Sequence, residues 1–129
     1  MPTNIEVAEQ LFTTLSAGDI DAAKALCAED MSISQNGGAA AGFASVAANT
    51  VAIRRIASNW RYENAVRVAT SNGFVEEHDA CGTLADGTEV RVHACIVAVM
   101  VEGLVSTMHE YLDTRSAGAR ALAAAFTKH

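Results

Sequence analysis

Aromatic and basic residues are both scarce in this sequence. Only 5% of its 129 residues are aromatic while half are hydrophobic, so a folded core has to be built from many small aliphatic side chains. The chain has nine lysines and arginines and fifteen acidic residues, which gives a formal charge of −6. The basic residues are not concentrated in any single stretch. Nucleic acid and anionic membrane are therefore not expected as partners, because both require a concentrated basic surface.

Long hydrophobic runs and paired cysteines are also missing. The longest apolar run, residues 94–101, is far shorter than the roughly 20 residues that cross a bilayer. The opening MPTNIEVAEQ has neither the basic start nor the apolar stretch of a secretion signal, which leads us to expect a cytoplasmic protein. The three cysteines, Cys27, Cys81 and Cys95, have no CxxC spacing, so we expect reduced thiols.

Three helices are predicted in the first half of the chain. The first starts at a capping Thr3 or Asn4, has apolar residues at helical spacing and stops at Gly18. A short second helix is expected over residues 20–30, and a third over residues 43–58 after a glycine-rich connection.

The periodicity then changes from helical to alternating. Residues 60–68 alternate as in a half-buried strand. Turn signals at residues 71–73, 86–87 and 102–103 divide the following segment into three more strands, which predicts an antiparallel meander. Ser116 can cap a terminal alanine-rich helix or tail.

Helices followed by an antiparallel sheet predict one α+β domain over residues 1–129, with the helices covering one face of the sheet. The sequence contains no repeat, linker or low-complexity tract. Domains of this kind tend to leave a pocket between their two layers.

Two-residue loops at residues 86–87 and 102–103 give an expected register for the last three strands. In that register His78, Cys95 and Glu110 form a row across the sheet. The full predicted face holds Glu76, His78, His93, Cys95, Met108 and Glu110. The opposite face receives Glu77, Asp79, Cys81, Val92, Ala94, Ile96, Ala98, Thr107, His109 and Tyr111. A single bulge or a three-residue loop would exchange the two sets, because a slip of one residue turns every side chain over.

Glu110 is the strongest candidate for chemistry on the predicted face. A carboxylate in an apolar pocket suits a general acid or base near neutral pH, whereas at the rim it would only be solvated. His78 and His93 can each serve as a proton shuttle beside it or simply hold a neighbour in place. Two histidines and two glutamates could also bind a metal, but their spacing lacks a dense motif of the HExxH kind, so no metal is expected.

Two stretches carry a resemblance to a known family. LFTTLSAGDIDAAKALCAEDMSI, a glycine-rich link with a helix, and the closing EGLVSTMHEYLD occur in the order typical of the nuclear transport factor 2-like superfamily. The chain resembles its SnoaL-like and ketosteroid isomerase-like branch. That resemblance implies a cone-shaped, curved antiparallel sheet with about three N-terminal helices on its concave face, enclosing a hydrophobic pocket. It also implies homodimers that pair through a sheet face, and enzymes that need no metal or cofactor.

The steroid isomerases of this family are an unlikely match for the chain's chemistry. The resemblance places Leu11, Gln35 and approximately Cys95 where those enzymes have a tyrosine, an aspartate base and a protonated aspartic acid. Because a carboxylate base and an acidic oxyanion hole move the proton in that reaction, we do not expect a classical ketosteroid isomerase.

The limonene epoxide hydrolase branch is matched only in part. By that resemblance Asn36, Asp79 and Glu110 correspond in kind to its orienting amide and its two acids. Glu77 stands where its arginine belongs, and Met108 replaces its tryptophan. Water-activating chemistry therefore stays open, and both His78 and Asp79 are kept as partners for Glu110.

We predict a cofactor-independent enzyme that acts on a small hydrophobic molecule by acid–base chemistry: isomerisation, cyclisation, dehydration or water addition. The candidate catalytic residues are Glu110, His78, His93 and Asp79. The candidate substrate-binding residues are Asn36, Trp60, Tyr62, Leu11, Leu15, Cys95, Met108 and Leu112. The alternative is a non-catalytic ligand-binding or dimeric scaffold domain, because one fold of this kind hosts many activities.

Overall fold

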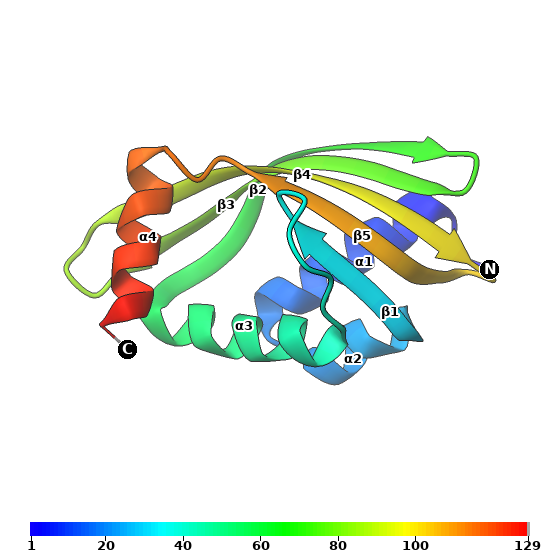
Figure 1. The fold of residues 1–129 in the computed structure, drawn as a ribbon, viewed down its shortest axis with the longest axis horizontal. Coiled ribbons are helices and arrows are strands. Elements are labelled where there is room, and N and C mark those ends of the chain that lie inside the picture. The colour runs from blue at the N-terminus through cyan, green and yellow to red at the C-terminus, as the bar shows by residue number, and fades with distance from the viewer. Residues whose placement is uncertain (129) are drawn as a thin grey trace.

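The computed structural model describes residues 1–128 (Figure 1). Its elements, in chain order, are α1 (Asn4–Ala17), α2 (Ile20–Ala25), β1 (Cys27–Gln35), α3 (Phe43–Ile56), β2 (Ala57–Thr70), β3 (Gly73–Leu84), β4 (Glu89–Val101), β5 (Leu104–Leu112) and α4 (Ala117–Thr127). The strands form one curved, open sheet in the order β1-β5-β4-β3-β2. The expected α+β class and the meander from β2 to β5 are confirmed, and β1 adds a parallel edge beside β5.

The first helix ends at a capping glycine, and the second ends where a strand begins. Thr3 and Glu6 form a reciprocal capping box at the start of α1, and Gly18 ends it in the left-handed conformation. The prediction that α2 extends to residue 30 was wrong, because β1 already begins at Cys27 and pairs with β5. That parallel pairing joins residues far apart in sequence, and local periodicity carries no trace of it.

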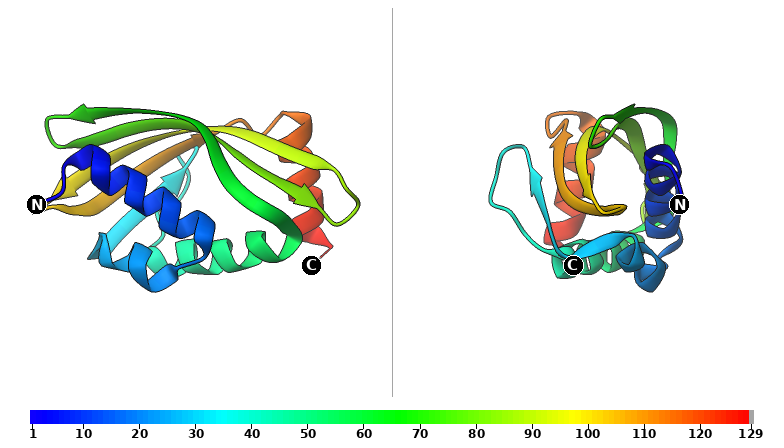
Figure 2. Two further views of the ribbon diagram at one scale, coloured as in Figure 1. Left: turned by 180° about the vertical axis from the view of Figure 1, so that it is seen from behind. Right: turned by 90° about the vertical axis from the view of Figure 1, so that its right-hand side faces the viewer.

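The helices cover the concave side of the sheet and one of its ends. In the views of Figures 1 and 2, α1, α2 and α3 lie beneath the arching strands, and α4 stands at the end of the sheet next to the C-terminus of α3. Ser116 caps α4, as predicted. At Gly118 the helix comes so close to β4 that an added Cβ would lie 2.6 Å from the carbonyl oxygen of Arg91. No helix within residues 1–128 is long and apolar enough to cross a membrane.

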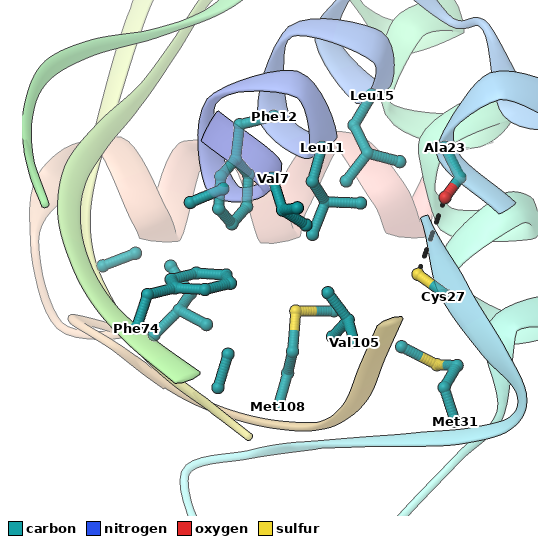
Figure 3. Close-up of a cluster of buried hydrophobic side chains, with 14 residues drawn as sticks. Val7, Leu11, Phe12, Leu15, Ala23, Cys27, Met31, Phe74, Val105 and Met108 are labelled. Carbon is teal, nitrogen blue, oxygen red and sulfur yellow. Dashed lines mark hydrogen bonds between the residues drawn. The ribbon is translucent and has the colours of Figure 1, made fainter. Parts of the chain in front are cut away.

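Two clusters of buried side chains hold the helices on the sheet. Figure 3 shows the larger one, where Leu11 and Phe12 of α1 meet Phe74, Val105 and other sheet residues. The smaller cluster joins Ile53 of α3 to Trp60 and Val92, with Leu122 and Phe126 of α4 packed on it. Tyr62 and Leu112 contact both clusters, so they mark the boundary between them.

Two bulges in β2 each reverse the face of the sheet to which the following side chains point. The pairing of β2 with β3 shifts by one residue between Ser58 and Arg61 and again between Glu63 and Val66. Asn59 and Asn64, which lie in the two shifts, have positive φ angles of 52° and 57°. The expected single alternation through residues 60–68 was therefore wrong: Trp60 and Tyr62 face the helices, and Val66 and Val68 lie exposed on the convex face.

The register between β3 and β4 differs from the prediction by one residue. Leu84 donates its backbone N–H to Thr88, so the loop contains Ala85, Asp86 and Gly87 rather than two residues. His78 consequently pairs with Ala94 instead of Cys95, and Glu76 pairs with Ile96.

A second one-residue shift separates β4 from β5. The turn at Glu102 and Gly103 has two residues, as predicted, and both take the positive φ that such a turn requires. The pairs Met100–Val105 and Val99–Thr107 then leave Ser106 as an extra residue. As a result Glu110 pairs with Ile96, and Tyr111 with Cys95.

Together the two shifts exchange the two faces of β4 relative to the prediction. The side chains of β3 and β5 lie on the faces that were predicted for them. Glu76, His78, Met108 and Glu110 do share the concave face. His93 and Cys95 were wrongly assigned to that face, because they lie on the convex face with Asp79. In exchange the concave face receives the four β4 residues predicted for the other side, namely Val92, Ala94, Ile96 and Ala98, all of them buried.

Candidate functional site

A row of residues, polar on every strand except β4, crosses the concave face from one edge of the sheet to the other. The pairings place Arg67, Glu76, Ile96, Glu110 and Gln35 side by side on the five successive strands. At one end Glu76 has no exposed surface and takes a hydrogen bond from the Nε of Arg67. At the other end the Nε2 of Gln35 donates to Oε1 of Glu110 over 2.7 Å.

His78 lies next to this row and is held on three sides. Its Nδ1 is 2.6 Å from Oε2 of Glu76. Phe12 of α1 meets the imidazole edge-on with ring centroids 4.8 Å apart, and the Tyr62 ring lies at 4.5 Å with an interplanar angle of 40°. With Nδ1 engaged by Glu76, Nε2 is the ring nitrogen that a ligand could use.

A hollow with two lobes separates the helices from the concave face. One lobe, of about 420 Å³, is lined by residues of α1, β1 and α3, such as Leu15, and by sheet residues that include Met108 of β5. The other, of about 370 Å³, lies between the sheet and α4 and is walled largely by apolar groups such as Trp60, Leu112 and Phe126. The two lobes adjoin, because both are lined by Gln35, Asn49, Thr50, Tyr62 and Glu110. His78 lines the apolar lobe.

Tyr62 provides a hydroxyl between the lobes. Burial raises the pKa of this phenol to about 12, and the nearby Glu110 and Glu76 charges act in the same direction. The phenol therefore keeps its proton at neutral pH and can donate a hydrogen bond to an oxygen of a bound molecule.

The hollow contains most, but not all, of the side chains predicted for it. Glu110, His78, Trp60, Tyr62, Leu15, Met108 and Leu112 line one lobe or the other. Leu11 is instead completely buried in the larger core cluster. Asn36 uses its amide to donate to the carbonyl of Leu112 and to accept from its N–H, which ties β1 to the end of β5.

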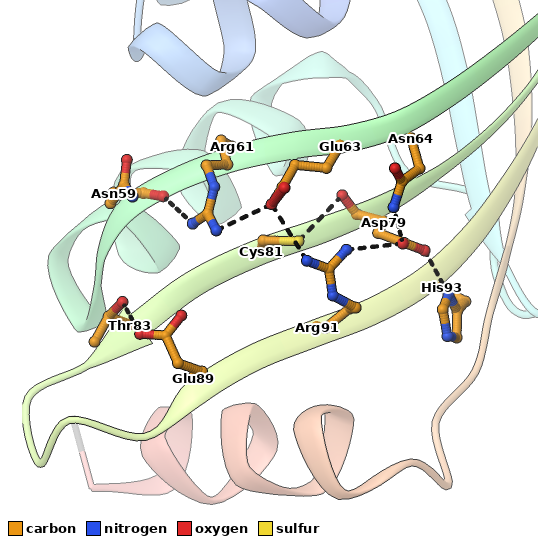
Figure 4. A network of polar contacts seen from close by, with 10 residues as sticks. All are labelled: Asn59, Arg61, Glu63, Asn64, Asp79, Cys81, Thr83, Glu89, Arg91 and His93. Atoms are coloured by element: carbon orange, nitrogen blue, oxygen red, sulfur yellow. Dashed lines mark hydrogen bonds and ion pairs between the residues drawn. The ribbon is translucent and has the colours of Figure 1, made fainter.

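Asp79 and His93 lie on the convex face, away from the hollow. The Nδ1 of His93 contacts Oδ1 of Asp79, while Asn64 and Arg91 each donate to Oδ2 over 2.9 Å (Figure 4). Hydrogen bonds from Asn64, His93 and Arg91 lower the Asp79 pKa to about 2. Glu63 joins the same network through ion pairs with Arg61 and Arg91. Cys95 lies near this pair in a shallow depression of the convex face.

Within residues 1–128, no three acidic, histidine or cysteine side chains are grouped so that they could hold a metal ion.

Three residues of the site were not predicted to have a role there. Asn49 was missed; it is an exposed residue of α3 that lies three residues after Val46 and lines both lobes. Arg67 was missed because the predicted single alternation through residues 60–68 puts it on the face opposite Trp60. The bulge at Asn64, which brings it to the same face, does not appear as a change in the sequence pattern. Gln35 was considered only as a replacement for a catalytic aspartate, and its contact with Glu110 depends on the long-range pairing of β1 with β5.

The sequence pattern of the SnoaL-like domain matches residues 8–108, which is most of the chain. The chain belongs to the SnoaL-like family. The match begins within α1 and ends at Met108, so it includes the strands that carry His78 and stops two residues before Glu110. No curated protein sequence matches this SnoaL-like protein.

Solved structures share the SnoaL-like fold at low sequence identity. A candidate polyketide cyclase from Pseudomonas putida is 22% identical, with a TM-score of 0.75 over 88% of this chain and 93% of that one. PrhC from Penicillium brasilianum is 14% identical, with a TM-score of 0.79 over 97% and 88% of the two chains. AclR from Streptomyces galilaeus, a candidate hydroxylase, is 11% identical, with a TM-score of 0.78 over 87% and 79%. At these identities the likenesses show a shared fold and nothing beyond it.

Proposed function

We propose that this SnoaL-like protein is a cofactor-independent enzyme that acts on a small hydrophobic organic molecule by general acid–base chemistry. The observation that carries the proposal is the pair formed by Glu110 and His78. Both side chains line the same largely apolar lobe, and each is oriented by a hydrogen bond from or to a neighbouring polar residue. His78 is buried and Glu110 is partly exposed, and both have the fixed orientation that proton exchange requires.

The spacing of the two groups suits a molecule held between them. They come from β3 and β5 with β4 in between, and Glu110 is level with Glu76, two residues from His78, so two strand spacings and this offset separate their backbones by roughly 12 Å. That separation is too long for direct proton exchange and comparable with the width of one or two fused rings. The Tyr62 phenol, which stays protonated, would bind a carbonyl or hydroxyl oxygen of the same molecule.

The reaction class fits isomerisation, cyclisation, dehydration or water addition, because each requires one group that removes a proton and one that returns it. Structures of similar fold include a candidate polyketide cyclase and a candidate hydroxylase, which supports an enzyme in general terms. Steroid isomerisation by the usual route is not proposed, because Leu11, Gln35 and a residue near Cys95 replace the groups it needs.

The test starts from ligands and proceeds to turnover. A panel of polycyclic phenols, hydroxyquinones, lactones and epoxides would be screened by thermal shift and by loss of ligand NMR signal. Compounds that bind would be incubated with protein and followed by mass spectrometry. We expect Glu110→Gln and His78→Gln each to lower turnover by about 10²–10⁴-fold. His93→Gln is the matched control, because His93 lies on the convex face, and its turnover should equal that of the wild type.

Tight binding without turnover of any bound compound would instead support the alternative, a non-catalytic ligand-binding domain. Turnover that survives both Glu110→Gln and His78→Gln would contradict the proposed acid–base pair.

We further propose a homodimer that pairs through the convex face of the sheet. No helix covers that face in Figures 1 and 2, and Val66, Val68, Val97 and Tyr111 expose between 38% and 58% of their surface there. The three free thiols, Cys27, Cys81 and Cys95, accord with the cytoplasm, which we propose as the location.

A further inference from the structure

Glu76 is a completely buried acid that the proposed chemistry does not itself use. It lies on β3 between Arg67 of β2 and His78, two residues further along its own strand. Its carboxyl oxygens have separate partners: Oε1 receives the Nε–H of Arg67, and Oε2 is 2.6 Å from Nδ1 of His78.

This arrangement determines where the hydrogen of the imidazole lies. The Arg67 guanidinium is permanently charged and can only donate, so Oε1 of Glu76 accepts its hydrogen bond. An ionised carboxylate can only accept hydrogen bonds, so the contact at Oε2 requires that Nδ1 of His78 carries the hydrogen. A neutral imidazole with Nδ1 protonated has its free electron pair on Nε2.

We propose that Arg67 and Glu76 are positioning residues that hold His78 in the tautomer with Nδ1 protonated, so that Nε2 is the proton acceptor of the site. The assignment of the base rests on the proposed acid–base function. Arg67 anchors Oε1, Oε2 then faces His78, and Phe12 and Tyr62 pack against the ring. A substrate proton that moves to Nε2 yields an imidazolium beside the Glu76 carboxylate, and the same proton returns to the product or to water.

The tautomer can be measured directly in the unmodified protein. Two-bond proton–nitrogen correlation spectra of the ¹⁵N-labelled chain distinguish a protonated Nδ1 from a protonated Nε2. Among the four histidines, the His78 signals are identified as those missing from His78→Gln. In spectra recorded at a pH where the ring is neutral, we expect the hydrogen of His78 on Nδ1. A ring protonated at Nε2 with Nδ1 bare would overturn the proposal without any Glu76 variant having to fold.

The variant Glu76→Gln tests the relay itself. Arg67 has only hydrogens to donate, so the amide oxygen must take the place of Oε1, and the amide NH₂ then faces Nδ1. That NH₂ donates, which forces the hydrogen of His78 onto Nε2. We expect the tautomer to switch in Glu76→Gln and to stay unchanged in Glu77→Gln, a matched change at the next residue on the convex face. An unchanged tautomer in folded Glu76→Gln would contradict the relay.

Arg67 is tested in the double variant Arg67→Met with Glu76→Gln. Without the guanidinium the amide is free to turn either end towards the ring, so the spectrum should show a mixture of tautomers. If the double variant shows the same single tautomer as Glu76→Gln, Arg67 does not orient the group. A switch of tautomer with unaltered turnover in His78→Gln would support the relay and contradict the proposed function, which separates the two.

Discussion

Gln35 and Glu110 lie side by side where β1 runs parallel to β5, and the amide nitrogen of Gln35 is 2.7 Å from Oε1 of Glu110. The orientation of the candidate catalytic carboxylate therefore depends on a strand that precedes it by 75 residues. The next residue, Asn36, strengthens this junction by pairing its side-chain amide with the backbone of Leu112.

Removing the amide should impair chemistry more than folding. In Gln35→Met the carboxylate loses its hydrogen bond, which for a charged acceptor is worth about 1.5–3 kcal/mol, so we expect kcat to fall at least tenfold with a smaller change in KM. Steady-state kinetics on a substrate found in the screen would measure both. Ser34→Ala changes the neighbouring residue, which contacts His109 on the convex side, and should leave kcat unaltered. Equal losses in the two variants would contradict an orienting role for Gln35.

Breaking the buried ion pair should be costly for stability. In Glu76→Leu the Arg67 charge and the His78 Nδ1–H lose their acceptor, and removal of one partner of a buried pair costs about 3–5 kcal/mol in the free energy of unfolding. Urea unfolding would measure this loss. Glu77→Leu, at an exposed position of the same strand, should change the free energy by no more than about 0.5 kcal/mol. Adding Arg67→Met to Glu76→Leu should recover part of the loss, because the unpaired charge is then absent; a further loss would argue against the pair.

The contribution of Asp79 should depend on pH in one direction. Because its pKa is about 2 in the fold, below its ordinary value of 3.8, folded Asp79 binds fewer protons than unfolded Asp79. Its stabilising effect is fully present above pH 4 and is lost as the pH falls towards 2. We therefore expect Asp79→Asn to be less stable than the wild type at pH 7, with a deficit that shrinks below pH 4 in urea unfolding. A deficit that stays constant from pH 7 to pH 2 would show that the lowered pKa contributes nothing.

The proposed dimer can be tested by placing a charge on the convex face. Val66 exposes 57% of its surface there, and burying an arginine against its own copy would be unfavourable. We expect the wild type to sediment as a dimer and Val66→Arg as a monomer. Val51→Arg is the control, because Val51 is comparably exposed, at 49%, but lies on α3. A monomeric wild type, or a dimer in Val66→Arg, would contradict the convex-face interface.

The helices, their caps and the meander were predictable because each depends on nearby residues. Thr3, Gly18 and Ser116 take the positions that capping chemistry assigns to them. The parallel edge strand β1 was not predicted as a strand of nine residues, because only its pairing with distant β5 takes Cys27 and the residues after it out of a helical pattern.

The candidate site was predictable in part for the same reason. The face shared by His78 and Glu110 was predicted correctly, whereas His93 was assigned to the wrong side. The difference comes from an extra residue in the loop at Ala85 and an unpaired residue at Ser106, and neither changes the hydrophobic pattern of β4. The start of β4, where Glu89, Arg91 and His93 alternate with apolar residues, does indicate that His93 points outward, but the prediction took the register from the loop lengths instead. From Cys95 onwards small apolar and thiol side chains occupy both faces, so that part of the strand gives no such signal.

The extra residue in the β3–β4 loop and the one at Ser106 have opposite consequences for the strands that follow them. Deleting either one alone would invert a strand and drive its outward-facing polar groups into the apolar interior. Deleting both would leave β3 and β5 as they are and turn over only β4. Because Glu89, Arg91 and His93 lie on the exposed side of β4, even the double deletion would carry charged groups into the interior, so both extra residues are needed to keep β4 in its register between β3 and β5.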